Sequence, residues 1–339
     1  MRRYIVAAKD IGAANVTLPV ALGLAERGHK VFVALDPSGR GHEVYARANP
    51  GFTLIGPDAN PAAAFNVLSP SAVIAGLSWP MGNEEVWGKA ANVAGIPLVH
   101  IEDFWGASVR SKAVPDLVGA VDAYGVGLAR RRFSRAGTFV SGNPGVREKP
   151  YEASPATQER VAAFRAKHGR ALVLLLGIEW DVAAFFASCA EMMQEPFGLI
   201  VRIHPKVLGQ PIPGGSETHA AYYERILAPW QDRMDMMGDL PTDDVVVCAD
   251  AAITGYSTAL ATAAQAGVPA ISLWTPETKR AVKESGGIDR LPFAGYGMPC
   301  VEEPQDLFPL IVPPPPRLVA ELRPYRPSSV IERIVALAS

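Results

Sequence analysis

Hydrophobic residues along the chain form short continuous runs, separated by longer stretches with helical periodicity. Near the N-terminus, an apolar strand over Tyr4–Ala8 precedes a helix that ends at Arg27–Gly28, and a second strand covers Val31–Leu35. Further apolar runs occur at FTLIG, SAVIAGL, IPLVHIED and GTFVSGNPGV, and a helix over Glu84–Ala94 is expected to end at Gly95. Continuous apolar strands that alternate with helices predict a parallel sheet covered on both faces.

The same pattern begins again after EKPYEASP, a polar and proline-containing stretch that suits an interdomain linker. Ser154 is placed to cap a helix with Pro155 at its first position, and Gly169 is placed to end it. The expected elements that follow are a strand at ALVLLLG, a helix over Asp181–Gln194, a strand at FGLIVRIHP, a helix near His219–Pro229, a strand ending in DVVVCAD, a helix over Thr258–Ala266 and a strand at PAISLW. Two doubly wound Rossmann-like α/β domains in series are therefore predicted.

The C-terminal tail has a different composition. A block of four prolines, Pro313–Pro316, is followed by Ser329 and Glu332, which have the spacing of a capping box for a last helix to Ala338. The apolar face of that helix needs a surface on which to pack. We assign residues 1–147 to the first domain, 148–318 to the second and 319–339 to the tail.

The composition is that of a globular protein with two domains: 339 residues, 49% hydrophobic and 19% charged. A formal net charge of -2 gives no basic field, so neither nucleic acid nor an anionic membrane is an expected partner. The first apolar run is too short for a secretory signal, and Gly and Pro interrupt the uncharged stretch Ala251–Pro276. We expect a cytoplasmic protein with no transmembrane segment and with reduced, structural cysteines.

The first candidate for chemistry is the segment Val201–Lys206, with the sequence VRIHPK. Arg202, His204 and Lys206 alternate at the end of an apolar strand, so a period of two places them on one face. Pro205 helps to end the strand, which puts His204 at the carboxyl end, where open α/β sheets bind ligands. Three cationic or donor groups suit a phosphate. The alternative is an ordinary charged strand end.

A second candidate lies about fifty residues further on, in the segment TGYSTALATAAQAGVPAI. Gly255 allows close approach of a ligand to the backbone, while Ser257 and Thr258 supply hydroxyl groups at the start of a helix. These features suit a second phosphate-directed segment. Helix capping by Ser257 or Thr258 is the alternative.

These two segments, in this order, resemble the carboxyl-terminal domain of GT-B-fold glycosyltransferases. The similarity is to capsule-type enzymes with a His-Pro motif and a downstream Ser-Ser/Thr motif, such as bacterial polysialyltransferases, Kdo transferases and CDP-glycerol glycerophosphotransferases. The GNPG turn, the helix ending in AERGHKV and a returning tail helix are also similar to that fold. The resemblance implies two domains that face each other across a cleft, with the tail helix packed on the first domain.

The resemblance also implies roles for particular residues. His204, Ser257 and Thr258 match residues that contact the donor phosphate, and Gly177 and Glu179 fall in a loop directed toward the donor. No carboxylate lies between Ala251 and Pro276, where a ribose-binding acid is often found, which favours a cytidine donor. CMP, CDP and UDP are the expected nucleotides, with no cofactor and no metal.

Inverting glycosyl transfer needs a base for the acceptor proton. Asp10 leads because it follows the first strand and precedes Gly12, which keeps the loop open, although capping of the next helix is the alternative. Asp103, with Glu102, is the second candidate, since it ends another apolar strand. The adjacent aromatic side chains of Phe104 and Trp105 could stack on a sugar, and His100 is expected in the core.

Several other classes are disfavoured because G-x-G-x-x-G, Walker A, G-x-S-x-G and H-E-x-x-H motifs and metal-ligand clusters are absent from the sequence. The basic run ARRRFSR is interpreted as a solvated helix face rather than an anion site. We therefore predict a metal-independent glycosyltransferase of polysaccharide biosynthesis, acting on a nucleotide-sugar and a hydroxyl acceptor. A non-hydrolysing nucleotide-sugar 2-epimerase and a non-catalytic nucleotide-sugar-binding protein are the alternatives, and a homodimer is left open.

Overall fold

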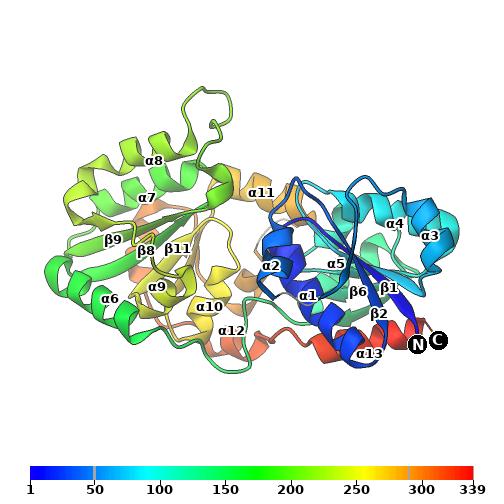
Figure 1. The fold of residues 1–339 in the computed structure, drawn as a ribbon. Helices are drawn as coiled ribbons and strands as arrows, with labels where there is room; N and C mark the ends of the chain where they lie inside the picture. The colour runs from blue at the N-terminus through cyan, green and yellow to red at the C-terminus, as the bar shows by residue number, and fades with distance from the viewer. Residues whose placement is uncertain (49–50, 289–290, 339) are drawn as a thin grey trace. The chain divides into compact units, whose positions relative to one another are not determined.

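A computed structural model of the chain describes residues 1–48, 51–288 and 291–338. Its helices and strands form two compact units (Figure 1). Unit 1 comprises Met1–Pro144, Ser285–Gly287 and Arg323–Ser339, and unit 2 comprises Gly145–Glu284 and Ile288–Leu322. Each unit has its own parallel sheet with helices on both faces. The predicted fold class, two doubly wound α/β units, is thereby confirmed.

Unit 1 contains a seven-stranded parallel sheet in the order β3-β2-β1-β4-β5-β6-β7. Its strands are β1 (Arg3–Ala8), β2 (Lys30–Leu35), β3 (Thr53–Ile55), β4 (Ala72–Gly76), β5 (Leu98–Ile101), β6 (Leu117–Ala120) and β7 (Gly137–Val140). Its helices are α1 (Ile11–Glu26), α2 (Gly41–Ala48), α3 (Pro61–Leu68), α4 (Asn83–Ala94), α5 (Ala123–Arg132) and α13 (Pro327–Leu337). The strand order reverses between β1 and β4, which makes their carboxyl ends the switch point of this sheet.

Strand β1 shows why the central strands are continuous apolar runs. Tyr4 and Val6 pack with α1 and α13 on one face, whereas Ile5 and Ala7 join a second core with α3 and α4 on the other. Successive side chains of a strand point to opposite faces. A strand covered on both sides must therefore be apolar at every position.

The tail helix α13 packs on α1 of unit 1, as predicted. Ile331 and Ile334 are buried in the core that α1 shares with β1. The Cδ1 atom of Ile331 lies 2.3 Å from the position that a Cβ would take on Gly23, so the absence of a side chain at Gly23 makes room for it. The hydroxyl of Tyr325 donates a hydrogen bond to the carbonyl oxygen of Val16 at 2.6 Å and fixes the segment before the helix.

The predicted capping box of this helix is wrong. The helix begins at Pro327, after Arg326, so Ser329 already lies inside its first turn. Proline at the start of a helix has a favourable fixed φ and no N–H that needs a partner. The helix therefore starts before the position that the Ser329 and Glu332 pattern indicates.

Unit 2 contains a six-stranded parallel sheet in the order β10-β9-β8-β11-β12-β13. Its strands are β8 (Arg170–Leu176), β9 (Phe197–Ile203), β10 (Met234–Asp235), β11 (Ala251–Thr254), β12 (Ala270–Leu273) and β13 (Cys300–Val301). Its helices are α6 (Pro155–His168), α7 (Asp181–Glu191), α8 (His219–Leu227), α9 (Thr242–Cys248), α10 (Ala259–Gln265), α11 (Pro276–Gly286) and α12 (Pro316–Glu321), and the last residues of α11 belong to unit 1. The strand order reverses between β8 and β11, and α7 and α8 lie on the face opposite α6 and α9 (Figure 1).

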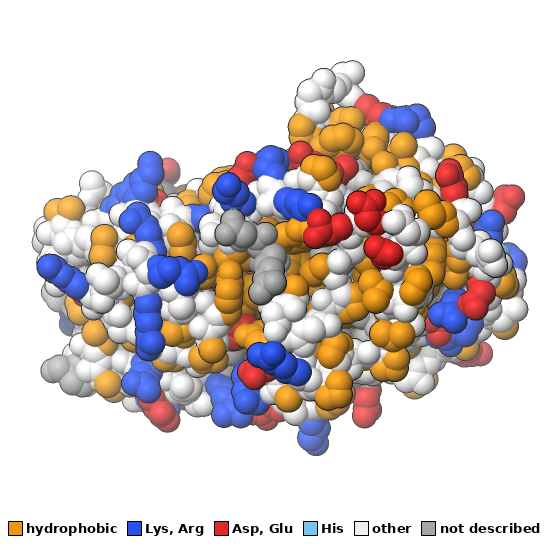
Figure 2. Space-filling view, turned by 180° about the vertical axis from the view of Figure 1, so that it is seen from behind, with side chains coloured by type: hydrophobic (Ala, Val, Ile, Leu, Met, Phe, Trp, Pro, Cys, Tyr) orange, Lys and Arg blue, Asp and Glu red, His pale blue; other side chains and the backbone are white. Residues whose placement is uncertain are grey.

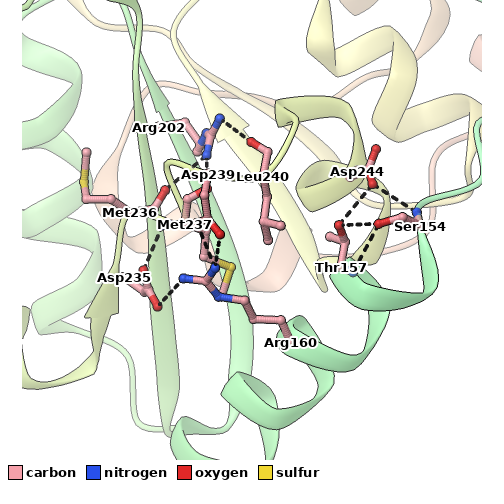
Figure 3. Close-up of polar contacts among 10 residues, drawn as sticks. All are labelled: Ser154, Thr157, Arg160, Arg202, Asp235, Met236, Met237, Asp239, Leu240 and Asp244. Carbon is pink, nitrogen blue, oxygen red and sulfur yellow. Dashed lines mark hydrogen bonds and ion pairs between the residues drawn. The ribbon is translucent and has the colours of Figure 1, made fainter.

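Residues 244–248 of the segment DVVVCAD belong to a helix, α9, and not to the predicted strand; the neighbouring strand β11 starts only at Ala251. The carboxylate of Asp244 in the first turn accepts hydrogen bonds from the main-chain N–H of Ser154 at 3.0 Å and from the hydroxyl of Thr157 at 3.0 Å (Figure 3). These bonds tie α9 to the start of α6. Tertiary contacts thus outweigh the strand preference of three consecutive valines. The predicted cap of α6 is confirmed, because the side chain of Ser154 accepts from the N–H of Thr157.

In the basic run ARRRFSR, the arginines of α5 lie on an exposed helix face, as the sequence predicts, and charged side chains of both signs occur elsewhere on the surface (Figure 2). Figure 2 shows Lys, Arg, Asp and Glu side chains distributed over the face in view, in keeping with a net charge of -2. Arg130, Arg131 and Arg132 are exposed in the last turn of α5. Within the described ranges, no helix is both long and apolar enough to cross a membrane.

Candidate functional site

A cavity of about 400 Å³ lies at the carboxyl ends of β8, β9 and β11, at the switch point of unit 2. Ligands of doubly wound sheets bind at this position, because the loops leaving neighbouring strands diverge there. The lining includes Gly177, Arg202, His204, Thr254, Tyr256 and Ser257. The two sequence segments singled out above, some fifty residues apart, therefore contribute to one cavity.

His204 lies directly after β9 and is exposed at the cavity. Its Nδ1 accepts a hydrogen bond from the main-chain N–H of Lys206 at 3.1 Å. In the neutral ring, the proton is therefore on Nε2, and an imidazole N–H is a suitable donor to a phosphate oxygen. The expected position of His204 at a strand end is confirmed.

The alternation of Arg202, His204 and Lys206 does not continue through the segment. Strand β9 ends at Ile203, and Pro205–Val207 form a turn of 3-10 helix. The predicted common face of these residues is wrong at Lys206, because the chain turns at Pro205 before the alternation reaches it. Arg202 and His204 line the cavity, whereas Lys206 is not part of its lining.

Arg202 holds the loop at residues 236–242 with its guanidinium group. It donates hydrogen bonds to the carbonyl oxygens of Met236 at 3.2 Å and Leu240 at 2.9 Å and to the carbonyl oxygen of Met237 (Figure 3). It also donates to the hydroxyl of Thr242 at 3.1 Å. Burial lowers the pKa of this guanidinium from its usual value. The group thus brings a positive charge to the cavity while several of its N–H donors bind the protein itself.

Ser257 lines the cavity and also caps a helix. Its hydroxyl oxygen accepts a hydrogen bond from the N–H of Ala259, the first residue of α10, at 3.2 Å. A hydroxyl that accepts in this way retains an O–H donor for a ligand. Thr258 has no side-chain capping bond and is not part of the cavity lining.

Gly255 has a packing role that differs from the predicted one. A Cβ at this position would lie 2.5 Å from the hydroxyl oxygen of Thr278 and 2.9 Å from a methyl carbon of Val182. The glycine thus allows α7 and α11 to approach the end of β11. The predicted approach of a ligand to the backbone of Gly255 stays a prediction.

Glu179 lies in the loop after β8, close to Gly177. Its side chain is only 5% exposed. Burial, followed by the like charges of Asp181 and Glu277, raises the pKa of Glu179 to about 7. The carbonyl oxygen of Gly177 accepts a hydrogen bond from the hydroxyl of Tyr223 at 2.7 Å, which fixes this part of the cavity wall.

Both candidate bases lie at the carboxyl end of the sheet in unit 1. Asp10 follows β1; its N–H donates to the hydroxyl of Ser78 at 3.1 Å, and its Oδ2 accepts from the N–H of Trp79 at 3.4 Å. Asp10 occupies the N-cap position of α1, but its side chain makes no capping hydrogen bond to the helix. Because Ser78 and Trp79 follow β4, Asp10 lies at the switch point of this sheet.

Asp103 lies against the first turn of α1, the helix that begins directly after Asp10. Its Oδ2 lies 2.0 Å from the position that a Cβ would take on Gly12. Gly12 is therefore a helical residue that makes room for the carboxylate, and the prediction that it keeps a loop open is wrong. The structure thus brings Asp103 to the same helix terminus as Asp10.

The aromatic residues near these acids differ from the expectation. Trp105 is buried, and its Nε1–H donates to Asp122 at 2.7 Å, so it cannot stack on a ligand. The guanidinium of Arg110 lies over the rings of Phe104 at 4.5 Å and Trp79 at 4.8 Å. Trp79 is 44% exposed, and no sequence motif singled it out.

The remaining buried groups near β5 are part of the core. His100 is buried as expected, and burial lowers its pKa to about 4. Glu102 is fully buried and accepts hydrogen bonds at Oε1 from the N–H of Ser108 at 2.9 Å and from its hydroxyl at 2.5 Å. In the part of the chain that the structure describes, no group of three or more His, Cys, Asp or Glu side chains is arranged to hold a metal ion.

Solved structures with a similar fold match nearly the whole of this chain. MurG from Acinetobacter baumannii has a TM-score of 0.58 and 14% sequence identity, with 99% of this chain and 100% of that chain covered. MnaA from S. aureus, solved with UDP, has a TM-score of 0.62 and 13% identity, with 99% and 95% covered. HepE from Anabaena, solved with UDP-glucose, has a TM-score of 0.62 and 12% identity, with 99% of both chains covered. No protein-family model and no curated protein sequence matches the chain.

Proposed function

We propose that this protein is a glycosyltransferase that takes a sugar from a nucleotide-activated donor and transfers it to a hydroxyl group. The observation that carries the proposal is the cavity at the switch point of unit 2, where an imidazole and a hydroxyl converge. The fold supports it, since solved structures with the same fold include HepE with UDP-glucose and MnaA with UDP.

In this proposal, the phosphate groups of the donor bind at the cavity in unit 2. The Nε2–H of His204 and the hydroxyl of Ser257 donate hydrogen bonds to phosphate oxygens, and the charge of Arg202 adds a favourable field. These donors stabilise the negative charge that the nucleotide acquires as the bond to the sugar breaks. CMP, CDP and UDP are the proposed nucleotides, and no metal is proposed for this step.

The acceptor hydroxyl loses its proton to a carboxylate of unit 1. Asp10 and Asp103 are the two proposed bases, because both lie at the carboxyl end of their sheet near the start of α1. Lys206, Thr258 and Gly255 remain weaker candidates for donor binding, since the cavity lining does not include them. An acceptor in polysaccharide biosynthesis is proposed on the resemblance to capsule-type enzymes.

The second proposal is a nucleotide-sugar 2-epimerase, because a solved structure described as a putative UDP-N-acetylglucosamine 2-epimerase from Listeria monocytogenes has a similar fold. An epimerase converts the donor without any acceptor. A transferase releases its nucleotide only when an acceptor, or water in its place, takes the sugar. A protein that binds the nucleotide-sugar and leaves it unchanged is the third proposal.

Titration calorimetry with CMP, CDP, UDP and GDP tests the common part of these proposals. We expect at least one cytidine or uridine nucleotide to bind, and His204→Ala to weaken that binding about tenfold, the usual effect of losing one hydrogen bond to a charged group. His168→Ala, at the end of α6, is the matched control and should bind as the unaltered protein does. Equal affinity of His204→Ala and the unaltered protein would refute the role of His204.

A donor assay with and without saccharide acceptors then separates the three functions. Nucleotide release that depends on an acceptor supports transfer. Epimerised donor in the absence of an acceptor supports the epimerase, and an unchanged donor supports simple binding.

A further inference from the structure

An exposed indole ring, that of Trp79, lies shortly after β4 in unit 1. Trp79 is 44% exposed and is the most exposed of the six tryptophans of the chain, since four others are buried and Trp180 is intermediate. Single apolar side chains are often exposed, so exposure alone does not indicate a binding site. The groups around the ring are what distinguish this position.

The main chain of Trp79 places its ring beside the candidate base Asp10. The N–H of Trp79 donates a hydrogen bond to Oδ2 of Asp10 at 3.4 Å. The Cγ atom of the indole is three covalent bonds from that nitrogen and therefore at most about 4 Å from it. Both residues lie at the switch point between β1 and β4, where doubly wound sheets bind ligands. A single sugar-sized ligand can therefore contact the ring and the carboxylate together.

The ring is held in place from one side. The guanidinium carbon of Arg110 lies over it, 4.8 Å from the ring centre, and is 4.5 Å from the ring centre of Phe104. Phe104 in turn packs against the core of unit 1. A cation in this position covers one face of the indole, so the opposite face contributes to the exposed part of Trp79. A ring that is already fixed loses little side-chain entropy when a ligand covers it.

An indole face beside a carboxylate suits a ligand with one flat apolar side and a polar edge. A pyranose ring has this form, because its C–H bonds meet the electron-rich face of an aromatic ring while its hydroxyl groups project from the rim. A wholly apolar ligand would remove water from the carboxylate of Asp10 and replace none of its hydrogen bonds. The combination of Trp79 and Asp10 therefore favours a saccharide.

We propose that Trp79 binds a pyranose ring of the acceptor by stacking, with one hydroxyl group of that sugar directed to the carboxylate of Asp10. This inference rests on the proposed function, because it takes unit 1 as the acceptor side and Asp10 as a candidate base. It makes the acceptor a saccharide, and it transfers to Trp79 the stacking role that was predicted for Phe104 and Trp105.

Saturation-transfer NMR tests the proposal without requiring turnover. The probes are the methyl glycosides of glucose, galactose, mannose and N-acetylglucosamine, each added to the unaltered protein, to Trp79→Ala and to Trp79→Phe. We expect saturable binding of at least one probe, with the strongest signals from C–H protons on one face of its ring. Loss of the stacking partner should weaken this binding about tenfold in Trp79→Ala, and about threefold in Trp79→Phe, which keeps a smaller ring.

The matched control is Tyr124→Ala, which removes another exposed aromatic side chain from unit 1, in α5, and should leave the affinity unchanged. A second measurement needs no variant, so it does not depend on how Trp79→Ala folds. In the unaltered protein, the bound saccharide should slow the oxidation of Trp79 by N-bromosuccinimide, followed by mass spectrometry of the peptide that contains it.

Equal affinity of Trp79→Ala and the unaltered protein, or no binding of any probe, would overturn this inference. Neither result concerns the cavity of unit 2, so calorimetry with CMP, CDP and UDP still decides the proposed function. Saccharide binding at Trp79 in a protein that binds none of these nucleotides would overturn the proposed function and leave the saccharide site standing.

Discussion

Replacement of Glu102 by glutamine should stabilise unit 1, and the gain should grow as the pH rises. Glu102 follows β5 and is fully buried. Ser108 donates two hydrogen bonds to its Oε1, and among the described residues nothing donates to its Oε2. Burial raises the pKa of Glu102 to about 7 from a usual value of 4.5. Glutamine keeps the Oε1 acceptor and the volume of the side chain but carries no charge.

The magnitude follows from the difference between the two pKa values. In the unfolded chain Glu102 loses its proton near its usual pKa, whereas in the folded protein it keeps the proton up to about pH 7. The folded state therefore binds more protons in this interval, and the free energy of unfolding falls as the pH rises through it. At about 1.4 kcal/mol for each pKa unit, the full loss is about 3 kcal/mol.

Hydrogen exchange of the amides in β5 and β6 measures the stability of unit 1 without interference from unit 2. Between about pH 5 and about pH 8, the free energy of opening of Glu102→Gln should increase by roughly 2 kcal/mol relative to the unaltered protein. A difference that stays constant over this range would refute the reasoning, because it would show that the folded and unfolded pKa values of Glu102 are the same.

Glu85→Gln provides a control, because we expect it to change the stability of unit 1 in the opposite direction. Burial raises the pKa of Glu85, but hydrogen bonds from Ser111 and Lys89 outweigh it, and the pKa lies below the usual value. Its ionised form therefore stabilises the fold above its ordinary pKa and loses this effect as the pH falls. Glu85→Gln should accordingly destabilise unit 1 at neutral pH.

Two further predictions concern the packing of α13 on α1 and the hydrogen bonds that hold α9. Ile331→Ala should lower the stability of unit 1 by about 2 to 5 kcal/mol in urea unfolding, because it leaves a cavity between α13 and α1; a loss below about 1 kcal/mol would show that the tail helix contributes little. Asp244→Ala should destabilise unit 2 by about 3 kcal/mol, since it removes the acceptor that joins α9 to Ser154. Asp243→Ala, which breaks only an exposed ion pair with Arg147, should cost less than about 1 kcal/mol, and equal losses for the two variants would contradict this account.

The parts of the fold that the sequence predicted are those in which local pattern and tertiary burial agree. The apolar run at Tyr4–Ala8 is a central strand with both faces covered, and Ser154 with Pro155 begins a helix as their local chemistry requires. The helix α9 could not be predicted, because Asp244 is held by groups about ninety residues away. The helix or strand preference of a segment depends on its own residues and does not reflect contacts with residues far away in the sequence.

The sequence predicted those residues of the candidate site that lie at strand ends, but not those whose position depends on turns or distant loops. His204 and Ser257 line the cavity, because the ends of parallel strands meet at one edge of the sheet whatever their separation in sequence. Lys206 was misplaced because a proline turn interrupts the alternation, and the bonds of Arg202 to a distant loop have no local signal. Trp79 was missed because an isolated aromatic residue in a loop has no periodicity.

The position of α13 has a consequence for how the molecule is made. Residues from Arg323 onward belong to unit 1, although the whole of unit 2 is synthesised before them. While a nascent chain grows from its N-terminus, the apolar surface of α1 that receives Ile331 and Ile334 must remain uncovered until α13 has been synthesised. A ribosome that stops between the end of unit 2 and α13 would thus release a chain in which the second unit is complete and the first still exposes hydrophobic surface, a ready target for chaperones and proteases.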